Sequence, residues 1–285
     1  MTIKFRIFSA CAAMFLAFWS LHSSAAGSAN ERVILNAAGE KVQYFAEGSG
    51  PLVVILPSAG RGAEDYEDLA PVIARQGFRV IRPQPRGIGA SNGKLQGVSL
   101  HEYAADVDAA IKAEKGGPAV IVGHAFGNWV ARVLAVDNPK AVRGIALVAA
   151  AAKKFPQELY QALDDSANSS LPKERRLKAL QLAFFAPGHD PAVWLDGWHL
   201  DAKNAQVEAS KRTPVSEWWA AGTVPLLEVQ AELDPFKTPE QHDELTKEFG
   251  SRVSVVVIRN ASHALVPEQP VEVAQALVKW IRSLK

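Results

Sequence analysis

The stretch at residues 123–127, with the sequence GHAFG, constrains the fold of this 285-residue chain more than any other segment. The apolar run at 119–122 before it is typical of a buried strand, and residues 126–136 after it have the pattern of a helix. A glycine at each end allows a sharp turn and a close approach of the two elements. The sequence therefore predicts a tight strand-to-helix turn with Ala125 at its apex.

Strand-like and helix-like segments alternate on both sides of this turn. Expected strands lie at 32–35, 41–45, 52–56, 78–81, 119–122, 145–148, 224–229 and 253–258, and expected helices at 65–75, 99–115, 126–136, 239–249 and 271–284. The first two strands flank a glycine turn and are expected to form an antiparallel hairpin. The remaining alternation predicts an α/β fold with a mostly parallel, twisted sheet and helices on both faces.

Residues 153–222 interrupt this alternation, because they lack a strong strand pattern and hold four of the seven tryptophans. We expect this segment to be a helical cap insertion. It separates two parts of the core domain, at 27–152 and 223–285. Trp194, Trp198 and Trp218 are expected to form the core of the cap, an apolar roof over a binding site, or both.

The first 26 residues have the pattern of an export signal. Two basic residues precede an apolar run at 7–21, and small residues at 24–26 offer a cleavage site. The run is short for a membrane span, so a retained anchor is the weaker alternative and no stable membrane association is expected. The only cysteine, Cys11, lies in this leader, which leaves no disulfide or thiol nucleophile in the mature chain. A periplasmic or secreted protein is predicted.

The charge balance does not favour a polyanionic partner. The chain has 31 basic and 30 acidic residues, and loss of the two basic residues of the leader changes the net charge from +1 to −1. Nucleic-acid binding is therefore not expected. No cluster has metal-ligand spacing, and the glycine pairs at 60–62 and 87–89 lack the third glycine of a dinucleotide motif. We expect no metal, no cofactor, and a monomer or homodimer that acts on a small apolar molecule.

Five landmarks follow the expected strands in a recognisable order. They are Leu-Pro-Ser-Ala-Gly at 56–60, Arg-Gly-Ile-Gly-Ala-Ser at 86–91, the turn at 123–127, Asp234 and His263. In this order the chain resembles the α/β-hydrolase superfamily over essentially all of residues 31–285. That family carries its nucleophile, acid and histidine in the same chain order, with the nucleophile in a Gly-x-Ser-x-Gly turn called the nucleophile elbow.

The resemblance implies a role for each matching position. His263 would be the general base, and Asp234 would hold its imidazole in the required orientation. The backbone N–H groups of Phe126 and Ala59 would form an oxyanion hole. Ala125 occupies the nucleophile position, and its methyl group cannot attack a substrate. Deleting the nucleophile of a triad costs roughly 10⁶ in kcat in the measured protease case.

Two polar residues beside these positions are candidate substrate contacts. Ser58 lies in the expected oxyanion loop, where a displaced nucleophile is the alternative role. His124 lies in the turn itself, where local packing or hydrogen bonding is the alternative.

The sequence thus predicts a hydrolase of a small apolar ester or lactone that has an Asp–His pair and an oxyanion hole but no elbow serine. One alternative is a non-hydrolytic Asp–His enzyme, a lyase or a cofactor-free oxygenase. Another is a pseudoenzyme that binds a small molecule under its cap. The alanine itself is either native or a replacement that disables a working serine hydrolase.

Overall fold

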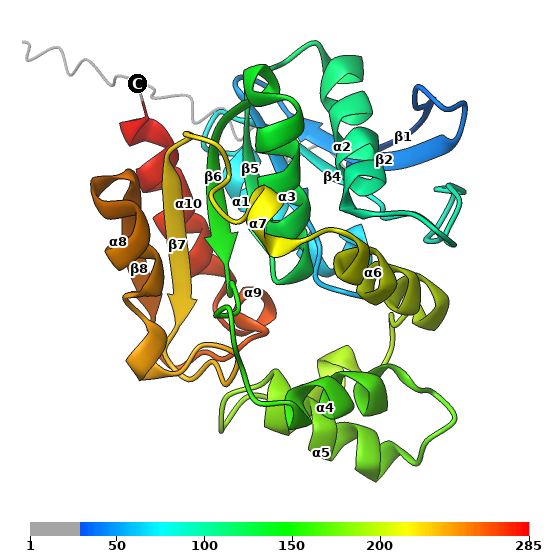
Figure 1. Ribbon diagram of the computed structural model, residues 1–285, viewed down its shortest axis with the longest axis vertical. Helices are drawn as coiled ribbons and strands as arrows, with labels where there is room; N and C mark the ends of the chain where they lie inside the picture. Colours follow the sequence, from blue (N-terminus) through cyan, green and yellow to red (C-terminus); the bar gives the residue numbers. More distant parts are fainter. Residues whose placement is uncertain (1–28, 285) are drawn as a thin grey trace, which may run out of the picture.

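The computed structural model describes residues 29–284, so the expected leader at 1–26 lies outside the described residues. Within this part the strands form one eight-stranded sheet, in the order β1-β2-β4-β3-β5-β6-β7-β8 (Figure 1). The strands are β1 (Asn30–Leu35), β2 (Lys41–Gly48), β3 (Leu52–Leu56), β4 (Arg79–Pro83), β5 (Ala119–His124), β6 (Val142–Val148), β7 (Leu226–Ala231) and β8 (Val253–Ile258).

The sheet is antiparallel at one end and parallel elsewhere. β1 and β2 form the expected hairpin, and β2 pairs antiparallel with β4. The strands from β4 through β3, β5, β6 and β7 to β8 are all parallel. The central strands β3 and β5 are buried along their whole length, which explains their continuous apolar sequences.

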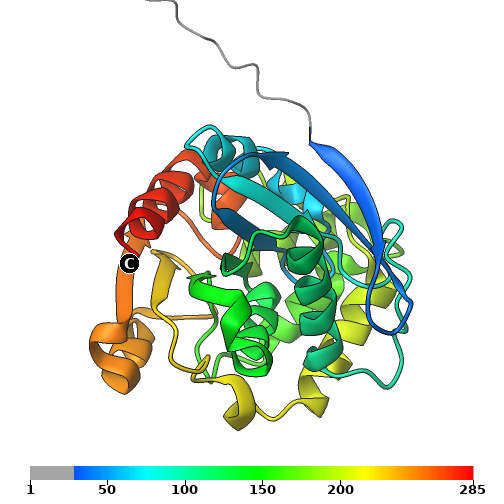
Figure 2. The same cartoon turned by 90° about the horizontal axis from the view of Figure 1, so that it is seen from above.

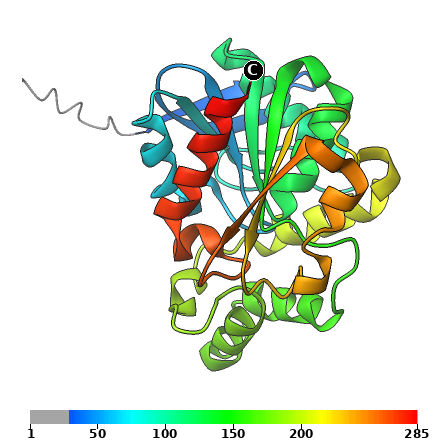
Figure 3. The same cartoon turned by 90° about the vertical axis from the view of Figure 1, so that its left-hand side faces the viewer.

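Helices cover both faces of the sheet, as Figures 2 and 3 show. The α-helices are α1 (Leu69–Ala74), α2 (Leu100–Glu114), α3 (Phe126–Asp137), α4 (Glu158–Ala167), α5 (Lys173–Ala183), α6 (Leu200–Arg212), α7 (Val215–Trp218), α8 (Glu244–Phe249), α9 (Leu265–Glu268) and α10 (Pro270–Ser283). Short 3₁₀ helices are η1 (Ala63–Tyr66), η2 (Pro139–Ala141), η3 (Pro191–Trp194), η4 (Pro239–Gln241) and η5 (Gly250–Arg252). One apolar core joins α2 and α3 to the sheet, and a second joins α1 and α10 to its other face.

Several predicted elements differ in length from the structure. The expected helix at 65–75 is two pieces, η1 and α1, because Pro71 lacks an N–H and its ring would clash with the carbonyl of residue 67 in a continuous helix. The expected helix at 239–249 is likewise divided into η4 and α8. By contrast, α2 begins as predicted, since Ser99 and Glu102 form a capping box at its N-terminus.

The insertion after β6 lies beyond the carboxyl ends of the parallel strands. Helices α4 and α5 lie at this end of the molecule, at the bottom of Figure 1, and share a third apolar cluster with Trp194 and Phe236. Trp218 and Trp219 instead belong to the core cluster of α2 and α3. The segment around α7 therefore packs on the core domain and not within a separate cap. Among the described helices, none is long and apolar enough to span a bilayer.

Candidate active site

The turn between β5 and α3 has the backbone geometry of a nucleophile elbow. Ala125 has φ 46° and ψ −110°, a conformation that costs an L-residue on the order of 1–3 kcal/mol. Its N–H donates to the carbonyl of Val148 at 2.9 Å. A Cβ on Gly123 would lie 2.5 Å from the carbonyl oxygen of Gly127, and one on Gly127 would lie 2.4 Å from that of Leu56. Both glycines are therefore required by close backbone contacts.

The loops after β7 and β8 bring Asp234 and His263 together. The Nδ1 atom of His263 lies 3.1 Å from Oδ1 and 3.0 Å from Oδ2 of Asp234. Asp234 Oδ1 also accepts a hydrogen bond from the N–H of Phe236 at 2.9 Å, which fixes the carboxylate. The Phe236 ring packs against the His263 imidazole with ring centroids 4.2 Å apart. Both members of the pair are 4% exposed, so water has little access to their contact.

In the loop after β3, the backbone N–H groups of Ser58 and Gly60 are hydrogen-bonded, and that of Ala59 lies between them. The N–H of Ser58 donates to the hydroxyl of Tyr66, and the N–H of Gly60 donates to the side chain of Gln206. Within the described residues, the N–H of Ala59 has no protein acceptor, and neither does that of Phe126 at the first position of α3. Ala59 and Phe126 both line the cavity, so these two groups are available to a developing negative charge.

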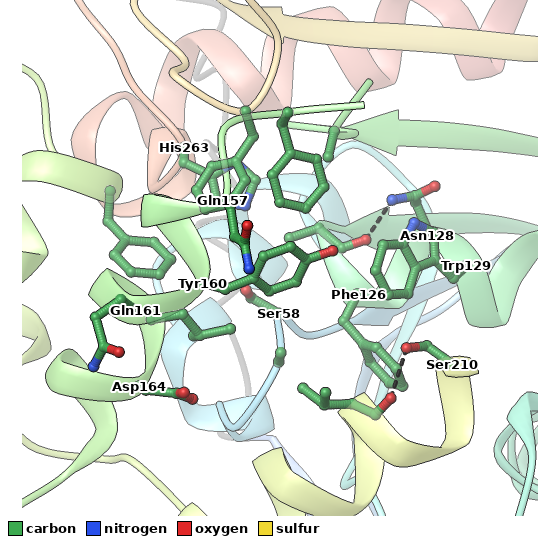
Figure 4. Close-up of a pocket in the computed structure, with 18 of the residues that line it drawn as sticks. Ser58, Phe126, Asn128, Trp129, Gln157, Tyr160, Gln161, Asp164, Ser210 and His263 are labelled. Atoms are coloured by element: carbon green, nitrogen blue, oxygen red, sulfur yellow. Dashed lines mark hydrogen bonds between the residues drawn. The ribbon is translucent and has the colours of Figure 1, made fainter. Parts of the chain in front are cut away.

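A cavity of about 750 Å³ opens between this end of the sheet and the insertion (Figure 4). Ala125, His263, Ala59 and Phe126 lie in its wall. Figure 4 shows Tyr160 and Gln161 of α4 on one side of the cavity, with Trp129 of α3 and Ser210 of α6 on the opposite side. The structure thus brings together four of the predicted site positions, and Asp234 lies directly behind His263. Ser58, at 3% exposure, also lines this cavity.

His124 is placed differently from the prediction. It does not line the cavity, it is 1% exposed, and both ring nitrogens are bonded. The hydroxyl of Tyr66 lies 2.7 Å from Nδ1, and the carbonyl of His263 lies 2.7 Å from Nε2. Burial, together with the nearby His263, lowers the pKa of His124 to about 3. The predicted substrate contact by His124 is therefore wrong, because its polar atoms are used inside the protein.

The three predicted tryptophan contacts are also absent from the cavity wall. Trp194 and Trp198 each pack against the guanidinium of Arg61, with 4.9 Å from its central carbon to each ring centroid. Trp218 packs instead against Trp129, with ring centroids 5.9 Å apart. These aromatic rings have packing partners elsewhere in the protein, which is why they do not form the roof.

Other aromatic and aliphatic side chains form the apolar wall. Phe184 belongs to the aromatic residues of the insertion that were expected to form the cap core or the roof, and it does line the cavity. The sequence-based prediction did not include the rest, which are Trp129, Phe155, Tyr160, Leu163 and Phe236. Helical spacing offered a signal for some of them, since Trp129 follows Phe126 by three residues, and Tyr160 precedes Leu163 by three. Phe155 and Phe236 lie in loops, where no periodic pattern could have indicated their direction.

The His, Asp and Glu side chains around the site are not arranged as a set of metal ligands in the described part of the chain. In residues 29–284, no group of three or more His, Cys, Asp or Glu side chains is arranged to hold a metal ion. What the site does contain is a histidine held by a carboxylate, two free backbone donors and an apolar cavity. This set of groups suits proton transfer beside a polarised carbonyl.

The fold and this site define an α/β hydrolase. The sequence profile of the Alpha/beta hydrolase family matches residues 53–276, and the chain belongs to that family. The predicted superfamily resemblance and fold class are thereby confirmed.

Three relatives illustrate the range of this family. Pyrrolizixenacetamide deacetylase of Xenorhabdus hominickii is 32% identical over 111 residues, which is 39% of this chain and 41% of that protein. Epoxide hydrolase A of Mycobacterium tuberculosis is 23% identical over 91% of this chain and 99% of its own length. The structure of an esterase from Exiguobacterium antarcticum aligns with a TM-score of 0.74 at 20% identity, covering 89% of this chain and all of that one. Because these relatives are hydrolases, they support the expectation of an enzyme.

Proposed function

We propose that this protein hydrolyses a small apolar ester or lactone, with a water molecule activated by His263 in place of a serine nucleophile. One observation carries the proposal. The His263 imidazole, held by Asp234 at 3.0–3.1 Å, lines the same cavity as Ala125 and the free N–H groups of Ala59 and Phe126. A base and an oxyanion hole thus remain although the nucleophile position is an alanine.

The reaction needs no group beyond these residues and water. Nε2 of His263 removes a proton from the water as its oxygen attacks the carbonyl carbon, and the carbonyl oxygen becomes an anion. The N–H groups of Ala59 and Phe126 stabilise that anion. The tetrahedral intermediate collapses with cleavage of the C–O ester bond. The departing alkoxide takes the proton from His263, which leaves a carboxylic acid and an alcohol.

The walls of the cavity support an apolar acyl group. The cavity that Ala125 lines also has the apolar side chains of Phe155, Leu163, Phe184, Phe236 and Trp129 in its wall. Polar side chains also line the cavity, among them Gln157, just before α4, and Gln161 on α4 (Figure 4). The deacetylase and esterase among the relatives are named for acyl transfer to water, which agrees with this reaction class.

The test compares the parent protein with His263→Gln and Ala125→Ser on p-nitrophenyl butyrate. We expect slow, burst-free turnover by the parent, because no acyl-enzyme forms. His263→Gln should lower that rate by about 10²–10⁴, the usual contribution of a general base. His101→Gln is the matched control, since His101 is a half-buried histidine outside the cavity and its loss should leave the rate unchanged.

Other outcomes would support one of the alternative functions. If the parent equals the uncatalysed rate and Ala125→Ser shows a burst and strong turnover, the scaffold is a disabled serine hydrolase. If no variant turns over the ester although the parent binds apolar ligands tightly, the protein is a binder. A parent rate that is unaffected by His263→Gln would also overturn the water mechanism.

A further inference from the structure

The oxyanion loop is held from the insertion as well as from the core. We define this loop as residues 57–61, and its turn is closed by the N–H of Arg61, which donates to the carbonyl of Ser58 at 3.1 Å. On the core side, Tyr66 accepts the N–H of Ser58 at 3.0 Å. On the other side, the buried side chain of Gln206 on α6 accepts the N–H of Gly60 at 2.7 Å through Oε1.

The segment that includes α6 packs tightly against the backbone of Gly60. The carbonyl of Gly60 accepts the N–H of His199, just before α6, at 2.9 Å. Gly60 has φ +70°, and a Cβ there would lie 2.8 Å from Cβ of Lys203. Gln206 is fully buried, so its bond to Gly60 is shielded from water. The N-terminal half of α6 therefore fits against the loop only because residue 60 lacks a side chain.

Arg61 adds a second connection from the same loop. Its side chain is 2% exposed and donates from Nη1 to the carbonyl of Asp196 at 2.6 Å. The guanidinium packs against both Trp194 and Trp198, while Asp65 accepts hydrogen bonds from its Nε and Nη2 atoms. The tryptophans predicted to contact substrate thus attach the insertion to the oxyanion loop.

We propose that the insertion positions the oxyanion hole, and that Gln206 is the positioning residue. This inference rests on the proposed function, because it assigns a cause to the placement of the Ala59 donor in that site. With Ser58 bonded to Tyr66 and Gly60 bonded to Gln206, the intervening N–H of Ala59 is the donor of this loop that remains for the substrate oxyanion. Gln206 does not line the cavity and touches no reacting atom.

Loss of the Gln206 contact should weaken binding of a charged ligand more than binding of a neutral one. Loss of the Gln206 acceptor leaves a buried N–H at Gly60 without a partner, and the loop can rotate to satisfy it. An oxyanion donor acts only when it lies at about 2.7–3.1 Å from the developing charge. A rotated loop would therefore weaken binding of a tetrahedral anion, while a neutral ligand of the same size would keep its apolar contacts.

The experiment measures this difference without relying on turnover. Calorimetry compares the affinities of a methyl butylphosphonate anion and neutral pentanamide for the full-length parent, Gln206→Met and Gln206→Asn. Methionine removes the acceptor at similar size, and asparagine withdraws it by one methylene. We expect at least a tenfold loss for the phosphonate and less than a twofold change for the amide in both variants. Asn204→Leu, which removes an exposed amide from the same helix, is the matched control and should change neither affinity.

If the ester is turned over by the parent, kcat should fall in both Gln206 variants while KM stays within twofold. Should Gln206→Met not fold, Gln206→Asn decides the question by the same measurements. The proposal is overturned if anion and amide lose affinity equally, if neither changes, or if the parent has no preference for the anion. Absence of ester turnover together with selective loss of anion affinity would refute the proposed reaction but support the role of Gln206.

Discussion

At the scale of single residues, His124 shows how a polar side chain beside the site can be structural. The carbonyl of His263 can only accept, so Nε2 of His124 carries a proton and donates to it. Nδ1 then accepts from the hydroxyl of Tyr66, which itself accepts the N–H of Ser58. This chain of bonds joins the oxyanion loop to the loop that carries His263, and it requires a neutral imidazole.

A pH-dependent stability follows from that requirement. Folding lowers the pKa of His124 from 6.5 to about 3, so the unfolded chain binds more protons between these values. The stabilisation is fully present above about pH 6.5 and is lost as the pH falls toward 3. Between pH 7 and pH 5, His124 should lower the free energy of unfolding by about 2 kcal/mol. Urea unfolding of the parent and His124→Gln at both pH values measures this difference.

His101 provides a control of opposite sign. Its hydrogen bond to Asp137 raises its pKa, so it stabilises the fold at low pH and loses this effect as the pH rises. His101→Gln should therefore make the fold more sensitive to acid, while His124→Gln makes it less so. Equal acid sensitivity in the parent and His124→Gln would contradict the assignment of a neutral, buried His124.

At the scale of elements, a buried ion pair connects β7 to the turn that carries Asp234. Glu228 lies in the middle of β7, fully buried, and its carboxylate contacts the ammonium group of Lys237. The N–H of Lys237 donates to the carbonyl of Asp234 at 3.1 Å. The same short turn thus holds Asp234 against His263 and is anchored to the sheet by the side chain of Lys237.

Removing one partner of this pair should destabilise the fold strongly. Lys237→Met leaves the Glu228 carboxylate buried without its cation, at a cost of about 3–5 kcal/mol in the free energy of unfolding. The double variant Lys237→Met/Glu228→Leu should recover part of that loss, since the Glu228 carboxylate is gone, but the buried guanidinium of Arg132, whose pKa is lowered by burial, then loses the nearby anion that raises it. Urea unfolding of both variants measures the coupling. Lys247→Met, at an exposed pair on α8, is the control and should change stability by less than about 0.5 kcal/mol.

A double variant as unstable as Lys237→Met would contradict this account. It would mean that the lysine acts by its packing alone and not by compensating Glu228.

At the scale of the whole molecule, the insertion is attached in two places to the loops that carry Ala59 and His263. On one side α6 and Arg61 hold the oxyanion loop. On the other side Glu268 of α9 accepts the N–H of Ala186, after α5, and the N–H of Ser262, beside His263, each at 2.6 Å. Burial raises the pKa of Glu268, and these two donors oppose that shift. The insertion and the loops around the site therefore form one connected structure.

Glu268→Ala should loosen both segments together. It leaves two buried N–H groups without an acceptor, each costing about 1–3 kcal/mol. Hydrogen exchange of the Ala186 and Ser262 amides should accelerate in parallel, with a matching loss of stability in urea. Glu272→Ala, at an exposed position of α10, should change neither amide. Faster exchange at only one of the two amides would show that Glu268 does not couple the segments.

Much of this architecture could be predicted from local patterns. Apolar runs predicted the strands, and the Ser99–Glu102 pair predicted the start of α2, because both depend on neighbours in sequence. The broken helix around Pro71 could have been foreseen from the missing N–H of proline. The direction of side chains at turns and loops could not, because it depends on partners far along the chain.

The sequence by itself determined the order of the elements, the sharp turn at Ala125 and the absence of a hydroxyl at its apex. Only the tertiary structure decided which groups face the cavity. It brought Asp234 and His263 to within 3.0 Å, turned His124 away from the cavity, and placed Trp194 and Trp198 around Arg61. The physical reason is that each polar or aromatic group takes the partner that satisfies it when buried, and those partners become neighbours only when the chain has folded.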